Sequence, residues 1–255
     1  MLLTDTHTHL YYETDEEKLA ELMQRCFDNK VERLFLPNVD IASIARINHL
    51  VNLYPENCFA MAGLHPCDVK EDYELVLDEI CQSMVDRDIC AIGEIGIDLH
   101  WDKSTLEIQK IAFKEQIKWA KDMELPIVIH CREAFDEIFE MLESEKGPDL
   151  RGILHCFTGD LDQALHAIDL GFHLGIGGVL TYKKSGLDEV LKHIPMSQIV
   201  LETDSPYLAP VPFRGKPNES SYLLHIAKKV AEVYNASMEE VAAVTTANSR
   251  LIFNR

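Results

Sequence analysis

Six side chains in this sequence are of the types that bind divalent metal ions, and each stands where a short apolar run stops. They are His7, His9, Glu94, His130, His155 and Asp204. Mixed imidazole and carboxylate donors suit zinc, manganese or magnesium, and no position in the set calls for a thiolate. Four histidines and two carboxylates are enough for two divalent ions roughly 3.5–4 Å apart, with one carboxylate bridging. Because such a pair of ions activates water, the set predicts hydrolytic chemistry.

The spacing of these residues also indicates a shared site. Side chains two residues apart in a strand point to the same face, so His7 and His9 are expected to face together. Glu202 and Asp204 share a face in the same way, with Glu202 one layer deeper. A single histidine in a strand is more often a packing or surface residue than a ligand. Six compatible residues at five separate strand ends are better explained by one metal centre.

Eight short apolar runs are predicted as strands, separated by amphipathic stretches. The runs are 2–5, 34–36, 59–63, 89–93, 127–129, 152–154, 172–175 and 199–201. Strands that alternate with helices predict βαβ units and a parallel sheet. Three of the helices are expected to be capped by a hydroxyl residue with a glutamate three positions later. These pairs are Thr14 with Glu17, Ser104 with Glu107, and Ser237 with Glu240.

The placement of the polar residues decides between two forms of such a sheet. In an open doubly wound sheet the five strand ends would be spread along one edge, whereas in a closed barrel they meet at one mouth. We therefore predict an α/β fold, a (β/α)8 TIM-like barrel. A chain of 255 residues suits one barrel, and no linker-like composition divides it. Residues 1–255 are expected to form a single domain.

The remaining histidines and two cysteines near the predicted ligands are expected to have structural roles. Cys131 and Cys156 directly follow two predicted ligands, and strand alternation should turn both away from the barrel interior as small packing residues. The histidines without a partner pattern lie on helical stretches or inside a strand. They are His49, His166, His173, His193 and His225.

Composition and charge limit the classes of partner. The net charge is −19, which opposes nonspecific wrapping of nucleic acid but leaves room for a nuclease whose bound cations reverse the potential locally. The seven cysteines are odd in number and include no C-x-x-C pair, which favours reduced thiols and a cytoplasmic location. We see no targeting segment and no apolar run long enough to cross a membrane, so no membrane association is expected.

Seven short motifs, taken in order, resemble those of the TatD deoxyribonuclease family within the amidohydrolase superfamily. They are residues 5–10 (DTHTHL), 63–66 (GLHP), 93–98 (GEIGID), 129–132 (IHCR), 155–159 (HCFTG), 201–207 (LETDSPY) and 214–216 (RGK), with Asn248 and Phe253 near the end. The resemblance covers essentially the whole chain. It implies a barrel of the metallo-dependent hydrolase type.

The resemblance also implies an activity. It points to a cytoplasmic enzyme that hydrolyses phosphodiester bonds of DNA or RNA with Mg²⁺, Mn²⁺ or Zn²⁺, including exonuclease action from the 3′ end of single-stranded DNA. It implies the same six metal ligands, with Glu94 bridging. One segment departs from the family pattern, because residues 214–220 read RGKPNES, with one basic residue fewer and a displaced proline. We therefore expect this loop to bind the substrate differently from the corresponding loop of the family.

Three further residues are predicted to bind the phosphate groups of the substrate. His65 and Arg132 follow the third and fifth strands, and Arg132 offers a bidentate fork. Arg214 could reach a flanking phosphate, although an ordinary salt bridge is the alternative for either arginine. Asp204 stands where a metal ligand can also take the proton from a water molecule, so Asp204 and Glu94 are the predicted catalytic residues.

Two other functions compete with nucleic-acid hydrolysis. The same scaffold could hydrolyse a small amide, lactone or ester, or an aminoacyl-RNA ester, because activated water serves acyl and phosphoryl centres alike. A non-catalytic binding protein is the second alternative, and the complete ligand set argues against it. Aromatic residues that could stack on bases, or simply pack, are Trp101, Tyr182, Tyr207 and Phe213.

Overall fold

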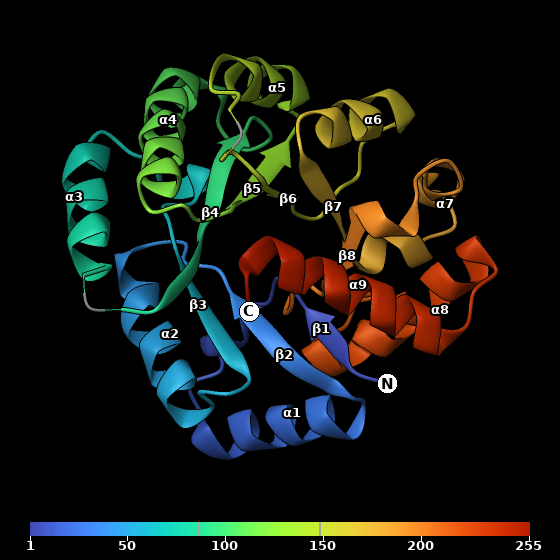
Figure 1. Cartoon of the computed structure of the whole chain (residues 1–255). Coiled ribbons are helices and arrows are strands. Elements are labelled where there is room, and N and C mark those ends of the chain that lie inside the picture. The colour runs from blue at the N-terminus through green and yellow to red at the C-terminus, as the bar shows by residue number, and fades with distance from the viewer. Residues whose placement is uncertain (86, 148) are drawn as a thin grey trace.

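The computed structural model describes residues 1–85, 87–147 and 149–255 and contains one parallel eight-stranded sheet (Figure 1). Neighbours in the sheet follow the order of the sequence from β1 to β8. The strands are β1 Leu3–Asp5, β2 Val31–Leu36, β3 Cys58–Ala62, β4 Ile89–Asp98, β5 Ile127–Arg132, β6 Gly152–Leu154, β7 Phe172–Ile176 and β8 Ile199–Leu201. Each predicted strand overlaps one of these.

Backbone hydrogen bonds join the first and last strands and close the sheet into a barrel. The amide of Thr6 donates to the carbonyl of Leu201 over 3.0 Å, and the amide of Asp204 donates to the carbonyl of His7 over 2.9 Å. The buried carboxylate of Asp5 strengthens the joint by accepting from the amide and hydroxyl of Thr203. The predicted (β/α)8 barrel is therefore confirmed.

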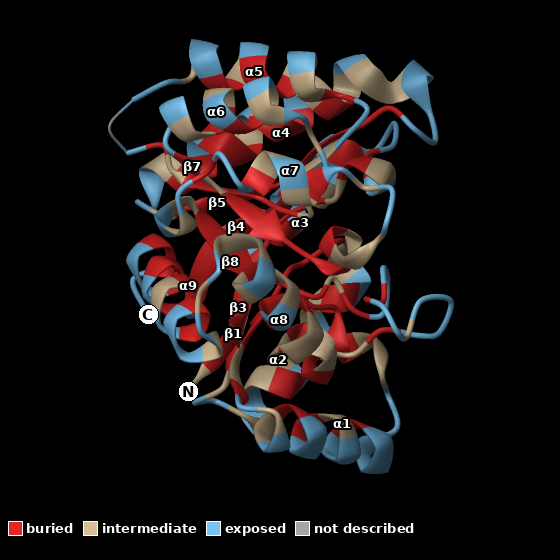
Figure 2. Cartoon of the chain, turned by 90° about the vertical axis from the view of Figure 1, so that its right-hand side faces the viewer, coloured by how far each residue is buried: buried red, intermediate tan, exposed pale blue. Residues whose placement is uncertain are grey.

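Helices surround the barrel and turn their polar faces outward, as the exposed outer surfaces in Figure 2 show. They are α1 Glu16–Asp28, α2 Ile41–Leu53, α3 Tyr73–Ser83, α4 Leu106–Asp122, α5 Phe135–Ser144, α6 Leu161–Asp169, α7 Leu187–Leu191, α8 Leu223–Tyr234 and α9 Met238–Phe253. Over the described residues, none of the helices has the length and apolar character needed to cross a membrane.

One predicted helix cap is confirmed and two are wrong. The hydroxyl of Ser237 accepts from the amide of Glu240 at the start of α9, as expected. At α1 the cap is Asp15, one residue after Thr14, because its carboxylate accepts from the amides of Glu17 and Lys18. Before α4 the chain forms a short 3₁₀ turn, Lys103–Thr105, capped by Asp102, and Ser104 lies inside that turn.

A small apolar cluster closes the barrel at the amino ends of the strands. Phe35 of β2 points into the barrel and stacks on Phe253 of α9, with ring centroids 4.0 Å apart. Helix α9 crosses the barrel end in Figure 1, and Ile252 joins the same cluster. Because this end is filled with apolar side chains, the polar residues gather at the opposite end, where the strands finish.

Candidate metal centre

The structure brings the six predicted ligands together at the carboxyl ends of the strands, but on two kinds of backbone. Glu94 and His130 lie within β4 and β5, which continue beyond their apolar runs. The other four, His7, His9, His155 and Asp204, lie in the segments that follow β1, β6 and β8. His7 is fully buried, and the other five line one cleft of about 640 Å³ at the barrel mouth.

The carboxylate of Glu94 lies at the centre of the cluster, between two groups of imidazole nitrogens. Its Oε2 is 3.1 Å from Nε2 of His7 and 3.7 Å from Nε2 of His9. Its Oε1 is 2.8 Å from Nδ1 of His130 and 3.2 Å from Nε2 of His155. Each oxygen of this buried carboxylate thus faces its own group of ring nitrogens.

Asp204 completes the group on the side of the first two histidines. Its Oδ1 is 3.4 Å from Nε2 of His9 and 3.9 Å from Nε2 of His7. Three sets of residues each offer potential ligand atoms that lie, within the set, no more than 4.8 Å from one another. These sets are His7 with His155 and Asp204, His7 with His9 and Glu94, and His65 with Glu94 and His130.

Hydrogen bonds behind the cluster determine which ring nitrogens of His9 and His155 face it. The hydroxyl of Tyr11 donates to the carbonyl of Pro37, so it accepts the hydrogen on Nδ1 of His9 over 2.8 Å. Nδ1 of His155 lies 3.1 Å from Oε1 of the fully buried Glu202, which can only accept. Nε2 of each ring is therefore left to face the cluster, as in metal sites where an outer partner orients the ligand.

Asp98 orients His130 in the same way. Its Oδ2 lies 2.8 Å from Nε2 of His130, and its Oδ1 accepts from the backbone amides of His100 and Trp101. Gln109 of α4 holds the backbone of Asp98 through both its amide and its carbonyl. The opposite nitrogen of His130, Nδ1, consequently points at Glu94.

Burial and the close approach of ionisable groups shift the pKa values of residues in the cluster. Burial alone would raise the pKa of Glu94, but the surrounding histidines lower it well below its ordinary value. Burial opposes the charged form of His155, yet the carboxylates of Glu202 and Glu94 raise its pKa well above normal. Burial and the stacked ring of His155 lower the pKa of His7, which favours the neutral form that binds metal.

The donor set fits a divalent cation. The ring nitrogens of His9, His130 and His155 that face Glu94 at 2.8–3.7 Å carry lone pairs when these rings are neutral, because the other nitrogen of each ring donates elsewhere, and lone pairs directed at a carboxylate repel it. Protonation relieves this repulsion in part, and a shared cation would relieve it fully. Imidazole and carboxylate groups at one buried point are the ligand types of zinc, manganese and magnesium sites. The chain therefore has histidine, glutamate and aspartate groups positioned to bind metal.

His65 lies beside this cluster but presents a donor to it. It precedes the 3₁₀ turn Pro66–Asp68, and its Nδ1 accepts from the amide of Cys67, so its Nε2 carries the hydrogen. That nitrogen is 3.4 Å from Oε1 of Glu94 and 3.3 Å from Nδ1 of His130. A nitrogen that bears hydrogen cannot bind a cation but can donate to a phosphate oxygen.

The structure separates the two predicted phosphate-binding arginines. Arg132, at the end of β5, lines the cleft. The guanidinium of Arg214 lies 4.3 Å from the ring centroid of Tyr182, and Arg214 is not among the described residues that line this cleft.

The altered loop 214–220 supports the backbone around Asp204. The side-chain amide of Asn218 donates to the carbonyls of Thr203 and Tyr207, each over 2.7 Å. Glu219 is anchored by a two-pronged contact with Arg25 of α1. In the described structure, residues after the displaced proline thus hold the segment that carries Asp204.

The predicted orientation is wrong for Cys156, whereas Cys131 packs against the apolar core as predicted, and both cysteines line the cleft. Strand alternation does not apply to Cys156, which follows β6 and has a left-handed backbone with φ 46°. Cys131 lies at the end of β5, where it both lines the cleft and packs against the core. Neither thiol is placed on the metal cluster by any short contact among the described residues.

Three residues that support the ligands were not predicted as part of the site or were given no role. Asp98 could have been found, because it lies four residues after Glu94 and therefore on the same strand face. Glu202 was predicted to lie one layer below Asp204 but was given no role, and in the structure its carboxylate orients the ring of His155. Tyr11 carries no sequence signal, since its contact with His9 depends on the turn Leu10–Tyr12.

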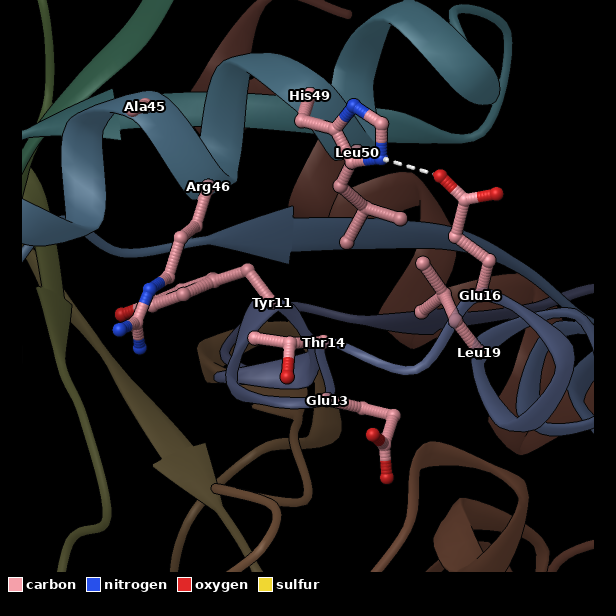
Figure 3. Close-up of a pocket in the computed structure, with 9 residues that line it drawn as sticks. All are labelled: Tyr11, Glu13, Thr14, Glu16, Leu19, Ala45, Arg46, His49 and Leu50. Atoms are coloured by element: carbon pink, nitrogen blue, oxygen red, sulfur yellow. Dashed lines mark ion pairs between the residues drawn. The ribbon is translucent and has the colours of Figure 1, made fainter.

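A second pocket lies outside the barrel, between the start of α1 and α2 (Figure 3). His49 of α2 faces Glu16 across it, with Nε2 of His49 3.8 Å from Oε1 of Glu16, while Arg46 lies at the other end of the pocket, on the side of Tyr11. Tyr11 forms part of its wall. The pair of His49 and Glu16 is exposed, and none of the six predicted ligands lines this pocket, so the chemistry of this protein is better placed in the cleft at the barrel mouth.

Comparison with known proteins agrees with this geometry. A family model described as TatD related DNase matches residues 4–254. The chain is 39% identical to the metal-dependent hydrolase YabD of Bacillus subtilis, covering 99% of both chains. It is 33% identical to the 3′-5′ ssDNA/RNA exonuclease TatD of Salmonella typhimurium, covering 91% of this chain and 92% of that protein. The crystal structure of YjjV, a TatD homologue from Escherichia coli, superposes with a TM-score of 0.93 at 28% identity, covering 99% and 98% of the two chains. The protein therefore belongs to the family of TatD-related DNases.

Proposed function

We propose that this metal-dependent hydrolase cleaves phosphodiester bonds at the 3′ end of single-stranded DNA or RNA, using two divalent ions. The observation that carries the proposal is the position of Glu94, whose two oxygens each face a separate group of ring nitrogens. A carboxylate so placed suits a bridge between two cations. The similarity to the Salmonella exonuclease supports the substrate class.

The two sets of ligands divide around this bridge. His7, His9 and Asp204 would hold one ion with Oε2 of Glu94, since their nitrogens and Oδ1 of Asp204 lie on that side. His130 and His155 would hold the other ion with Oε1. Magnesium, manganese and zinc all accept these ligand types.

When bound, such ions lower the pKa of water towards neutrality and offset the negative charge of a phosphodiester. The chain supplies the remaining functions. Burial would raise the pKa of Asp204, but His9, His155 and His7 lower it, so its carboxylate is ionised and can accept a proton from the attacking water. Nε2–H of His65 and the guanidinium of Arg132 lie on the cleft wall and would donate to the phosphate oxygens. Arg214 would contact a more distant phosphate.

The thiols support a reducing, cytoplasmic location for this activity. All seven cysteines are free, and three of them, Cys26, Cys58 and Cys90, are buried in the core. Burial raises the pKa of Cys58 to about 12, which keeps that thiol protonated and unreactive.

The deciding experiment is digestion of single-stranded DNA labelled at either end, with Mg²⁺, Mn²⁺ or EDTA. We expect a ladder of products shortened from the 3′ end that requires a divalent ion and disappears in Glu94→Gln. Glu143→Gln is the matched control, because Glu143 is on α5, away from the cleft, and its exposed carboxylate pairs with His166.

Two results would contradict the proposal. One is equal digestion by Glu94→Gln and the wild type, which would identify a contaminating nuclease. The other is faster metal-dependent hydrolysis of p-nitrophenyl esters or lactones than of oligonucleotides, which would assign the site to small acyl substrates.

A further inference from the structure

Trp101 is an exposed aromatic side chain on the rim of the cleft. Its side chain is 72% exposed and lines the cleft, whereas Trp119, the other tryptophan, is 8% exposed on α4. An indole left in water forgoes the free energy that burial would supply. Large exposed apolar groups beside a polar site are typical of surfaces that bind a ligand.

The loop that carries Trp101 is held in place by the same carboxylate that orients His130. Oδ1 of Asp98 accepts from the amides of His100 and Trp101 at 2.9 and 3.3 Å. The amide of Leu99 donates to the carbonyl of Arg132, and Nδ1 of His100 lies 2.7 Å from the carboxylate of Glu133. The backbone that carries the exposed indole is therefore anchored beside the metal cluster.

Arg132 lies against this indole. Its guanidinium carbon is 5.3 Å from the ring centroid of Trp101, within the range of a cation–π contact. Among the described residues that line the cleft, Arg132 is the one lysine or arginine, and no ion pair is formed with it. A cation–π contact leaves N–H groups of the guanidinium available to the two oxygens of a phosphate.

The cleft also has an apolar rim at another strand end. Tyr207 and Leu208, in the segment after β8, are 52% and 40% exposed, and both line the cleft. A cleft of about 640 Å³ is within the range of small-ligand sites and has room for a nucleotide. Aromatic and apolar groups at the rim, with the metal ligands at the floor, suit a base above and a phosphate below.

We propose that Trp101 stacks on the nucleobase next to the scissile phosphodiester while the edge of Arg132 binds that nucleotide's phosphate. This assignment rests on the proposed nuclease function and deepens it. A base can stack on Trp101 only after it leaves its neighbour in a duplex, so the platform selects single-stranded ends and tolerates any base.

The test compares Trp101→Ala and Trp101→Phe on two single-stranded oligonucleotides. One has normal bases, and the other carries a tetrahydrofuran abasic residue at the two 3′-terminal positions. We expect Trp101→Ala to raise KM on the normal oligonucleotide about tenfold or more with kcat changed less than twofold, because base–aromatic stacking contributes on that scale. Trp101→Phe should recover most of the loss, and the wild type and Trp101→Ala should be equal on the abasic oligonucleotide.

Binding provides a second readout that does not depend on turnover. In the variant Trp119→Phe, Trp101 is the remaining tryptophan, and its fluorescence should be quenched by the normal oligonucleotide and unchanged by the abasic one. Trp119→Phe is also the control for activity, since Trp119 does not line the cleft.

The outcomes separate the two proposals. Cleavage by the wild type with unchanged KM in Trp101→Ala, or quenching that ignores the missing bases, overturns the platform and leaves the nuclease function standing. No cleavage of either oligonucleotide by the wild type overturns the nuclease function, and the platform with it.

Discussion

Replacing Asp98 by asparagine removes one charge from the outer layer of the metal centre without changing its size. The carboxylate accepts at both ends, from Nε2–H of His130 through Oδ2 and from the amides of His100 and Trp101 through Oδ1. An asparagine side chain accepts at one end only. If its oxygen faces His130, its NH₂ opposes two backbone donors; if its NH₂ faces His130, the ring must move its hydrogen to Nδ1, the nitrogen that faces Glu94.

The size of the effect follows from that contact. The Asp98–His130 hydrogen bond is 2.8 Å long, and Asp98 is 2% exposed. Hydrogen bonds to charged groups contribute about 1.5–3 kcal/mol. At 1.4 kcal/mol for each factor of ten, this range corresponds to about 10–100-fold in affinity, which matches the usual cost of losing an outer partner of a metal-bound histidine.

Calorimetric titration of the metal-free protein with Mn²⁺ measures this change in metal affinity directly. We expect Asp98→Asn to weaken binding about 10–100-fold and to regain most of its activity at high Mn²⁺ concentration. Asp102→Asn is the control, because Asp102 is an exposed cap of the next turn that accepts from Ser104. Unchanged Mn²⁺ affinity in Asp98→Asn together with lost turnover would refute the reasoning, since Asp98 would then act on the substrate and not through His130.

Three further changes test the architecture around the site. Gly175→Ala places a methyl group against the carboxylate of Glu202 and 3.1 Å from Cα of His155. Urea unfolding should therefore show a free energy of unfolding lower by about 1–3 kcal/mol, and calorimetry should show weaker Mn²⁺ binding. An unchanged free energy of unfolding together with unchanged Mn²⁺ affinity would contradict this. Phe253→Ala leaves a cavity beside Phe35 at the closed end of the barrel. Urea unfolding should show a free energy of unfolding lower by about 3–5 kcal/mol, while the metal affinity should be unchanged. Removal of metal by EDTA should lower the Tm, because an ion at 100 times its Kd stabilises the folded state by about 2.7 kcal/mol. The circular dichroism spectrum of the barrel should stay unchanged. Loss of that spectrum would show that the core needs the metal.

The barrel could be predicted because its strands are buried on both faces. Such strands read as short apolar runs, and each of the eight predicted runs overlaps a strand of the structure. The strands whose ends were placed several residues too early are β4 and β5, which continue to Asp98 and Arg132. Polar residues that line the cleft, Glu94 and Asp98 in β4 and His130 and Arg132 in β5, interrupt the apolar pattern, so the continuous apolar run stops before the strand does.

The six predicted ligands converge for a related reason. Parallel strands in a closed barrel bring their carboxyl ends to one mouth, and this constraint acts on residues as distant as His7 and Asp204. The contacts behind the ligands obey no such rule. Tyr11 reaches His9 through a single 3₁₀ turn, and the hydrogen on His65 depends on the amide of Cys67, so neither follows from spacing along the chain.

The charge of the cleft explains how so acidic a protein could act on a phosphate polymer. Asp68, Glu94, Asp98 and Asp204 line the cleft with Arg132 as the one guanidinium among its described residues, which leaves an excess of negative charge. Two divalent cations would more than offset that excess, and low-dielectric walls would focus the reversed potential at the mouth. The rest of the surface, on a chain of net charge −19, still repels nucleic acid. In the proposed nuclease, metal binding and substrate binding would thus be coupled, and a strand that can approach only at one charged point would be engaged by its end.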